Sequence, residues 1–225
     1  MYTERASSIG GAVVWRRTAA AVGARVLPDG CMDLIWADGA LLIAGPDTRA
    51  HLVTHVVGTR YVGLRFAPGV GPAVFGVPAH ELRDQRVALD ALWPGRLVRD
   101  LAGRVTDSAT PGRTLEHIAS TRLHDKTADI DWPRVAEVLR RNSSVDTTAG
   151  MLGLSRRQLH RRCLAAFGYG PKTLAKILRF NDALELARTG GALADVAIDS
   201  GYADQAHLAR DTKVLAGVPM TRLLG

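Results

Sequence analysis

The chain has 225 residues, which is enough for two domains or one large domain. Its formal net charge of +7 favours a polyanionic partner, and residues 131–225 hold 14 Lys and Arg but only 9 Asp and Glu. The two cysteines lie far apart, so a disulfide framework is implausible, and no stretch approaches the roughly 18 apolar residues of a membrane span. Charges near the N-terminus interrupt any signal-peptide core, so we expect a soluble, cytoplasmic protein.

The first third of the chain has the pattern of a small antiparallel sheet. Apolar runs alternate with turn residues, and Asp38-Gly39 between two such runs is the strongest short-range signal for a β-hairpin. A second hairpin is expected to turn at Gly58-Thr59. The four predicted strands are 31–37 paired with 40–44, and 51–57 paired with 60–66. The tract 68–78 is rich in Gly and Pro, which predicts loop with at most one turn of helix.

From about residue 79 the apolar period changes toward 3.6, which predicts helices. They are expected over 79–83, 89–93, 97–104 and 111–123. Residues 124–129 are polar, have little to bury and predict a linker. The sequence thus predicts an α+β fold: a small antiparallel β-rich N-terminal domain with helices over 1–124, suited to sensing or association, followed by a second domain over 131–225.

The second domain is predicted to be all-α, with seven helices. They are expected over 132–141, 145–152, about 156–167, 171–188, 193–200, 205–216 and 219–224. Ser144, Ser155 and Asp204 can each cap the helix that follows, because their side-chain oxygens accept from free backbone N–H groups. Gly168 stands where a helix needs a left-handed residue at its C-terminal end.

The third of these helices and the start of the fourth are strongly cationic. The segment Ser155–Arg179 contains seven Arg or Lys residues and no Asp or Glu. Its apolar residues recur every fourth position and predict a buried stripe of Leu159, Cys163 and Phe167. Another face then carries Arg157, His160 and Arg161. A helix that is apolar inside and cationic outside, preceded by a short helix and a glycine turn, suits the DNA major groove.

This arrangement of a short helix, a glycine turn and a second helix occurs twice in the sequence. The pattern from Ala149 to Arg161 returns 48 residues later up to Gly201 and 49 residues later beyond it, so the second turn is one residue longer. Each copy predicts a helix-turn-helix, whose second helix reads bases. The 18-residue helix between them rises about 27 Å, so the reading helices could lie roughly 34–36 Å apart, one DNA turn. One chain could then occupy two adjacent major grooves.

Roughly the last 95 residues resemble the AraC/XylS-type DNA-binding domain. The resemblance is carried by LADVAIDSGYADQAHLARDTKVLAGVPMTRLL, residues Leu193–Leu224. It implies base contacts from Arg157, His160 and Arg161 in the first unit and from Gln205, His207 and Arg210 in the second. Arg can bond guanine bidentately and Gln can do the same with adenine.

Further cations flank these positions, and the second unit departs from the family pattern. The phosphate contacts or solvated charges are expected to be Arg156, Arg162, Lys172, Lys176 and Arg179. Relatives usually carry an aromatic residue at Thr212 and a basic pair at Asp211 and Val214. We therefore expect looser packing and a weaker phosphate grip in the second unit.

The amino-terminal half, over about residues 10–100, is similar to a poorly characterised domain that precedes this module in some regulators. Within it, Asp33 and Arg65 each lie in an apolar run that predicts a strand. Because a lone buried charge is expensive, we expect these two to pair, either as a purely structural pair or as a polar anchor for a small effector.

Candidate chemistry in this half is weak. Cys31 and Cys163 are expected to be buried thiols, His51 and His55 would be too far apart on a strand to share an ion, and no metal-binding spacing occurs. We predict no catalytic residue, no metal and no cofactor.

The sequence therefore predicts a non-enzymatic regulator that binds a specific double-stranded DNA site. Control is expected through a small-molecule effector or self-association as a homodimer, and the family resemblance implies RNA polymerase as a further partner. Two alternatives stay open: a Cys-dependent sensor or repair-type enzyme targeted to DNA, and a non-specific DNA-binding protein. The operator, the effector and the sign of regulation cannot be read from the sequence.

Overall fold

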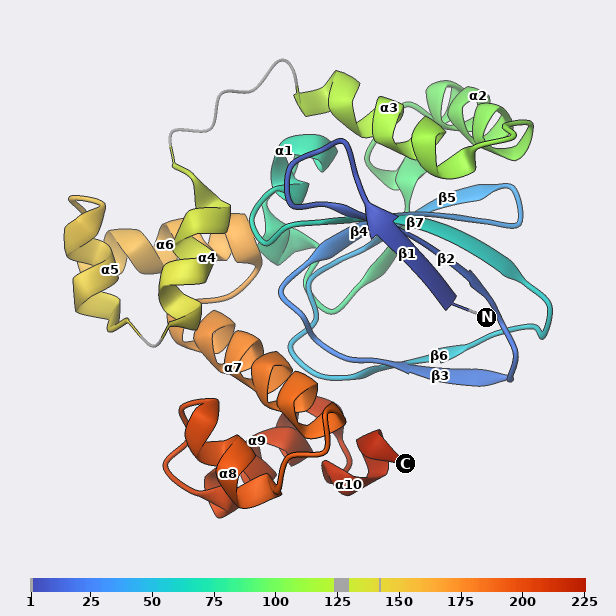
Figure 1. Cartoon of the computed structure of the whole chain (residues 1–225). Coiled ribbons are helices and arrows are strands. Elements are labelled where there is room, and N and C mark those ends of the chain that lie inside the picture. Colours follow the sequence, from blue (N-terminus) through green and yellow to red (C-terminus); the bar gives the residue numbers. More distant parts are fainter. Residues whose placement is uncertain (1, 124–129, 142) are drawn as a thin grey trace.

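The chain is described here by a computed structural model that covers residues 2–123, 130–141 and 143–225 (Figure 1). The N-terminal part is an antiparallel β-rich domain with helices, and the C-terminal part is helical, so the predicted α+β fold is confirmed. No helix in these ranges is long and apolar enough to cross a membrane. The predicted linker 124–129 lies outside the described residues, and the domain limits remain a prediction.

The main sheet has the strand order β1-β2-β7-β4-β5-β8 in the described residues, and all its pairs are antiparallel. Its strands are β1 (Tyr2–Ala6), β2 (Val13–Thr18), β4 (Met32–Ala37), β5 (Ala40–Ala44), β7 (Arg60–Phe66) and β8 (Arg86–Ala88). Two further strands, β3 (Gly23–Val26) and β6 (His51–Thr54), pair with each other. We call them the ribbon; it lies below the main sheet in Figure 1.

The first predicted hairpin, β4–β5, is confirmed, with Asp38 and Gly39 both at positive φ in its turn. The second predicted hairpin is wrong, because β6 pairs with β3 while β7 lies between β2 and β4. The buried run within β7 suits the centre of a sheet, whereas the four residues of β6 alternate between half-buried and exposed. Strands β1, β2, β3 and β8 were not predicted.

One face of the main sheet packs on helices and forms the N-terminal core. Leu34, Ile43 and Leu64 project from this face, and each is fully buried against the helical layer. The helices are α1 (Gly71–Phe75), α2 (Gly95–Thr106) and α3 (Pro111–Leu123), with 3-10 turns η1 (Ala79–Glu81) and η2 (Leu89–Ala91). The helices predicted over 79–83 and 89–93 are therefore only short 3-10 turns. Helix α1 is the one helical turn that the prediction allowed within 68–78.

The C-terminal part contains seven helices in the described residues, as predicted. They are α4 (Trp132–Arg140), α5 (Val145–Met151), α6 (Arg156–Phe167), α7 (Pro171–Arg188), α8 (Leu193–Asp199), α9 (Gln205–Ala216) and α10 (Thr221–Leu224). Their limits lie within two residues of the predicted ones. A second core, separate from the first, fills the space between them around Leu174, Ile177 and Phe180, none of which is exposed.

Candidate nucleic-acid interface

The first helix-turn-helix unit consists of α5, a glycine turn and α6. Gly153 adopts φ +63° in the turn, and the backbone N–H of Leu154 donates to Ala149 O at 2.9 Å. Ser155 then caps α6 in a reciprocal capping box with Gln158. The predicted stripe is buried, since Leu159, Cys163 and Phe167 are at most 1% exposed. The sequence therefore fixes both the turn and the face that α6 presents.

The second unit, α8 and α9, repeats this construction. Gly201 adopts φ +81°, and the N–H of Tyr202 donates to Ala197 O at 2.8 Å, the counterpart of the bond in the first turn. Asp204 caps α9 by accepting from the N–H of His207 at 2.6 Å. Each reading helix also ends at a left-handed glycine, Gly168 or Gly217. The duplication seen in the sequence is thus a duplication of backbone hydrogen bonds.

The outer face of α6 is exposed and cationic. Arg157, Arg161 and Arg162 make no hydrogen bond or ion pair within the described residues, so their guanidinium groups are free to bind a ligand. Arg156 differs because it forms a bidentate ion pair with Asp146 of α5. Its hydrogen bonds lower the pKa of the Asp146 carboxyl. Arg156 therefore braces α5 against α6 in this structure.

His160 is exposed but does not project freely. A Cβ placed on Gly170 would lie 2.7 Å from His160 Nε2, so the imidazole covers the backbone of the turn between α6 and α7. A side chain at position 170 would clash with the ring. His160 therefore packs on the following turn, and base contact would require it to move.

The outer face of α9 carries less free charge. Gln205 and Arg210 are exposed and make no polar contact within the part of the chain that the structure describes. His207 is half-buried, with its ring edge-to-face on Tyr202 at 5.0 Å and its Nε2 3.8 Å from Asp211 Oδ2. Asp211 also accepts an ion pair from Lys176 Nζ at 2.8 Å. One carboxylate thus pairs with a lysine and also lies beside a histidine.

The unusual residue at position 212 does not leave a gap at its own site. Thr212 is fully buried, and its hydroxyl donates to Leu208 O at 2.8 Å. It occupies the place that Cys163 takes in α6, which is also fully buried. The looser packing expected here is absent at this residue, because the intrahelical bond satisfies the polar group.

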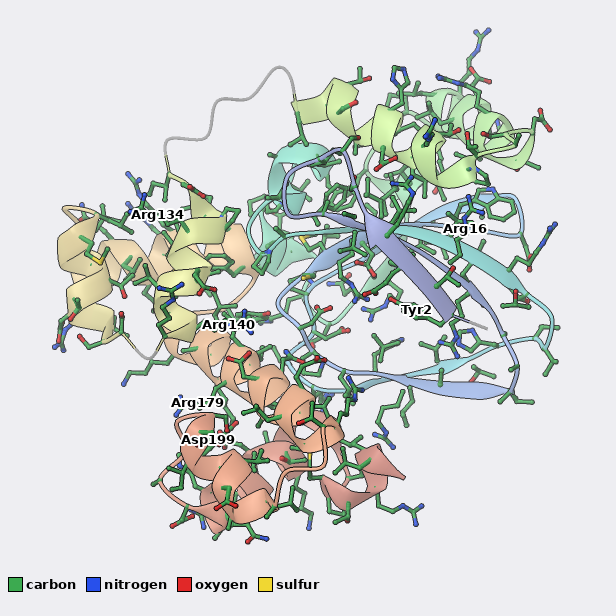
Figure 2. All side chains as sticks on the ribbon, viewed as in Figure 1. Tyr2, Arg16, Arg134, Arg140, Arg179 and Asp199 are labelled. Atoms are coloured by element: carbon green, nitrogen blue, oxygen red, sulfur yellow. The ribbon has the colours of Figure 1, made fainter. Side chains whose placement is uncertain are left out.

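Helix α7 joins the two units, which lie near its two ends (Figure 1). Arg140 of α4 pairs with Asp182 of α7, with Nε 2.8 Å from Oδ1. Arg179 lies where α7 meets α8 (Figure 2); it donates to Gly201 O at 3.2 Å and lies 5.2 Å above the Tyr202 ring. Arg179 and Lys176, expected to be phosphate contacts or solvated charges, thus contact α8–α9 instead. The predicted spacing of one DNA turn stays a prediction.

The N-terminal part contacts the carboxyl ends of both reading helices. At the end of α9, Ala50 N–H donates to Leu215 O and Arg25 donates to Ala216 O, each at 2.6 Å. At the end of α6, Arg83 donates to Gly168 O and His80 Nδ1 lies by Leu164 O, each at 3.3 Å. Carbonyl groups at a helix C-terminus lack intrahelical donors, so the bonds to Gly168 O, Leu215 O and Ala216 O satisfy them, whereas Leu164 O already accepts from the N–H of Gly168. The amino-terminal halves of α6 and α9 remain uncovered.

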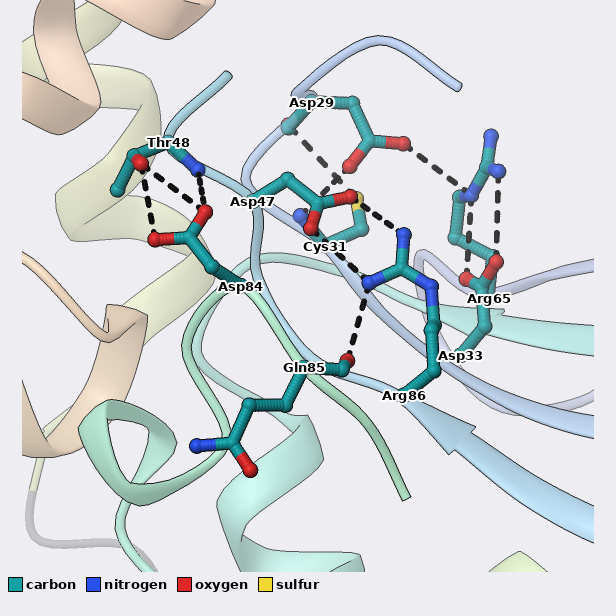
Figure 3. A network of polar contacts seen from close by, with 9 residues as sticks. All are labelled: Asp29, Cys31, Asp33, Asp47, Thr48, Arg65, Asp84, Gln85 and Arg86. Atoms are coloured by element: carbon teal, nitrogen blue, oxygen red, sulfur yellow. Dashed lines mark hydrogen bonds and ion pairs between the residues drawn. The ribbon is translucent and has the colours of Figure 1, made fainter. Parts of the chain in front are cut away.

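The predicted partners in the N-terminal part lie together (Figure 3). Arg65 Nε lies 3.2 Å from Asp33 Oδ1 and 3.2 Å from Asp29 Oδ2, so the pair expected from the sequence has a third member. Burial raises the pKa of Asp33, while the nearby Asp33 carboxylate raises the pKa of Arg65. Burial, followed by the Asp29 charge, raises the pKa of the Cys31 thiol. These surroundings favour the protonated thiol and oppose nucleophilic chemistry.

A cavity of about 1180 Å³ opens beside this network, between the second face of the main sheet, the ribbon and α7. Its wall includes another ion pair, in which Arg86 Nη1 and Nη2 donate to Asp47 at 2.9 and 2.5 Å. Sequence reasoning missed the cavity, this pair and Asp29. The alternation of charged and apolar residues in β4 and β7 was the available signal, but it does not reveal which distant strands lie beside them.

His51 and His55 both line this cavity, and Nδ1 of His55 is 2.8 Å from the Tyr61 hydroxyl. No cluster of metal-binding side chains occurs in the described ranges.

Comparison with known proteins gives two family matches and one fold. Residues 148–224 match the family described as helix-turn-helix domain, and residues 12–88 match a domain of unknown function, DUF6597. No curated protein matches the chain. Among solved structures, apo ToxT K231A from Vibrio cholerae is 13% identical with a TM-score of 0.53, covering 99% of this chain and 98% of that one.

A ToxT structure with a bound unsaturated fatty acid is similar over 95% of this chain and 94% of its own, at 13% identity and a TM-score of 0.50. At this identity the likeness establishes a shared fold. Residues 148–224 are thus similar to a helix-turn-helix domain family and residues 12–88 to DUF6597, and the helix-turn-helix match supports a DNA-binding transcription regulator.

Proposed function

We propose that this regulator reads a specific duplex with α6 and α9 in two adjacent major grooves. The observation that carries the proposal is the matched construction of the two units, each with the amino-terminal half of its reading helix exposed. Arg157 and Arg161 in α6 and Gln205 and Arg210 in α9 are the base-contacting candidates that need no rearrangement. A good bidentate contact of this kind contributes about 1–3 kcal/mol of discrimination.

The other three candidates have a present partner that DNA would have to replace. Arg156 would exchange Asp146 for phosphate, and both histidines would leave the surfaces on which they pack, Gly170 for His160 and Tyr202 for His207. These side chains are therefore proposed to adjust on binding, while the four free ones are already positioned.

Selection of bound sites from a random DNA pool tests this proposal, with the full chain as bait. Two short motifs, separated centre to centre by about 10 base pairs, are expected if both helices read adjacent grooves. Recovery of one short motif would show that a single unit reads bases. Recovery of no motif, with affinity falling steeply with salt on every sequence, would support the non-specific alternative.

The N-terminal part is proposed to control this binding. The cavity is large enough for a small molecule, and ToxT, which shares the fold, has been crystallised with an unsaturated fatty acid. Self-association is the second proposed route, because Val22, Leu52, Val56 and Val57 on and beside the ribbon are all more than half exposed. A cytoplasmic location and contact with RNA polymerase follow from the proposed role.

The enzyme alternative gains no support from Cys31. Cys31 is half-buried and lines the cavity beside Arg65, so it is less buried than expected from the sequence, but its pKa is raised rather than lowered. A thiol reagent is expected to label Cys31 of the native protein slowly; rapid labelling or alkyl transfer to Cys31 would favour the repair-type reading.

A further inference from the structure

The two reading helices can be compared position by position, because their caps, buried residues and terminal glycines coincide at a spacing of 49 residues. The cap Ser155 corresponds to Asp204, and the buried Leu159 corresponds to the buried Leu208. In two helices with the same start and the same buried side, residues at equivalent positions project in equivalent directions. A difference between equivalent outer residues is therefore a difference in what each helix can read.

Each reading helix has four outer positions, which we define as its first, second, fifth and sixth residues. They lie in the amino-terminal half, the part of a recognition helix that meets base edges. All residues at these positions are exposed. Those of α6 are Arg156, Arg157, His160 and Arg161, and those of α9 are Gln205, Ala206, Ala209 and Arg210. Only the sixth position carries the same residue in both helices.

The shared sixth position predicts a base that the two half-sites have in common. Arg161 and Arg210 have no polar partner within the described residues, so both guanidinium groups are free. A guanidinium group can bond O6 and N7 of one guanine at once, which is the commonest specific contact in the major groove. Each half-site should therefore contain a guanine at the same place in its motif.

The second position separates the two helices most sharply. Arg157 of α6 is a further guanidinium group without a partner in the described chain, which predicts a second guanine. Its counterpart Ala206 has only a methyl group, and Ala209, three residues later, offers another on the same side of α9. A methyl group neither donates nor accepts a hydrogen bond, and its favourable contact in the major groove is with the 5-methyl group of thymine. Helix α9 therefore favours thymine where α6 favours guanine.

The first position also differs, because its neighbour on the preceding helix differs. In the first unit Arg156 is held by Asp146, but the equivalent place in α8, 48 residues later, is Ala194. Gln205 makes no hydrogen bond within the described part of the chain, so its amide is free to bind a base. A glutamine amide can donate to N7 of adenine and accept from the adenine amino group. Gln205 therefore adds an adenine to the bases that α9 favours.

We propose that the two half-sites belong to different base classes: a guanine-rich motif under α6, and a motif under α9 that joins A·T pairs to one guanine. Ala206 and Ala209 are then specificity-determining residues, because a polar side chain at either place would read another base. This inference rests on the proposed function, since it assigns bases to the two helices placed in adjacent grooves. It also makes the site directional, because turning the duplex round exchanges two halves that are not alike.

The thymine contact can be tested by changing the DNA alone. In the site recovered by selection with the full chain, each thymine of the A·T-containing motif is replaced by deoxyuridine, which lacks only the 5-methyl group. At least one replacement should weaken binding about fourfold in fluorescence anisotropy, the loss expected when one methyl-sized group is no longer buried. The control is the same replacement at thymines in the spacer between the motifs, which should leave the affinity unchanged. No loss at any thymine of the motif, or an equal loss in the spacer, would overturn the proposal.

A second test changes the protein. Ala206→Arg gives α9 the residue that α6 carries at its second position, so a new selection should replace an A·T pair of this motif by a G·C pair, with a preference of at least about fivefold. The motif read by α6 should not change. The matched control is Val214→Arg, which adds the same charge at an exposed residue about two turns further along α9 and should change the affinity for all sequences alike. An unchanged motif in Ala206→Arg, or the same new G·C pair in Val214→Arg, would refute the assignment.

The proposed function and this inference fail in different ways. Two motifs of the same base class, or a second motif without thymine, would overturn this inference and leave the reading of adjacent grooves intact. A single motif, or no motif at all, would refute the proposed function, and this inference would fail with it.

Discussion

The ion pair between Lys176 and Asp211 predicts a variant that binds DNA more tightly than the natural chain. Asp211 lies on α9 at the place equivalent to Arg162 on α6, where it pairs with Lys176 and lies beside His207. Asp211→Asn removes the negative charge but keeps the size and hydrogen-bonding capacity of the side chain. Lys176 would then be available to a phosphate. A gain in affinity cannot arise from misfolding, which makes this variant informative.

The size of the gain follows from counterion release. One added phosphate contact steepens the slope of log K against log salt by about 0.9, which corresponds to roughly eightfold tighter binding at about 0.1 M salt. The gain should be the same on specific and unrelated sequences, because phosphate contacts carry no base information. Fluorescence anisotropy over a series of salt concentrations measures both quantities.

The control for this experiment is Asp90→Asn, which removes the same charge from an exposed position in the N-terminal part. It should change neither the slope nor the affinity by more than a small factor, since exposed charges farther away than a Debye length are screened. If Asp211→Asn leaves the salt slope unchanged, or if both variants gain equally, Lys176 does not approach the phosphate backbone and the assigned face of α9 is wrong.

Three further variants test other parts of the structure. Arg157→Ala should relax preference at one base pair, whereas Lys172→Ala should weaken all sequences alike; a binding-site selection on each variant distinguishes them, and identical profiles would contradict the roles given to these residues. Gly168→Ala should lower the free energy of unfolding by at least about 1–2 kcal/mol in urea, because φ is +84° and the new Cβ would lie 2.6 Å from a proline ring. The Arg5 hydrogen bond lowers the pKa of Glu116 to about 2, so the ion pair should stabilise the folded state above about pH 5 and stop doing so as the pH falls toward 2. In Glu116→Gln the free energy of unfolding should therefore depend less on pH between about 5 and 2. An unchanged pH dependence in this range would refute the assignment.

The C-terminal part could be predicted almost completely because its signals are local. Caps such as Ser155 and Asp204, the turn glycines and the apolar stripe of α6 all act within about four residues of one another along the chain. Because the helix-turn-helix pattern occurs twice, each copy supported the helix limits predicted for the other. Helix limits therefore came from the sequence without knowledge of the tertiary structure.

The N-terminal part was harder because strand pairing is not local. The pattern of β7 shows a buried strand, but nothing within it shows that its neighbours are β2 and β4 rather than β6. The pairing of Asp33 with Arg65 could be expected from the cost of two buried charges. The second pair, Arg86 with Asp47, joins β8 to a loop 39 residues earlier, and no periodicity indicates such a contact.

The same limit applies to charges within the reading units. Lys176, Arg179 and Arg156 all look like free cations in the sequence, yet the structure places each against a neighbouring element. Local pattern gives the face on which a residue lies, but the partner across that face comes from tertiary packing. Which cations on α6 and α9 are free of intramolecular partners could therefore be determined only from the structure.

The two units are attached to the N-terminal part by different kinds of contact, and this difference assigns them different roles. Besides the contacts of Arg83 and His80, the first unit is attached by close apolar packing, since a Cβ on Gly69 would lie 3.0 Å from Phe167 of α6 and 2.4 Å from Trp132 of the adjoining α4. At the end of α9, Ala50 and Arg25 each donate one hydrogen bond, and a typical hydrogen bond contributes only about 0.5–1.5 kcal/mol net because water can replace it. Separating packed apolar surfaces has no such replacement and costs more. Movement of the ribbon would therefore release α9 before α6, so the first unit, which also carries the larger number of free arginines, would keep its place on DNA while the second engages or withdraws.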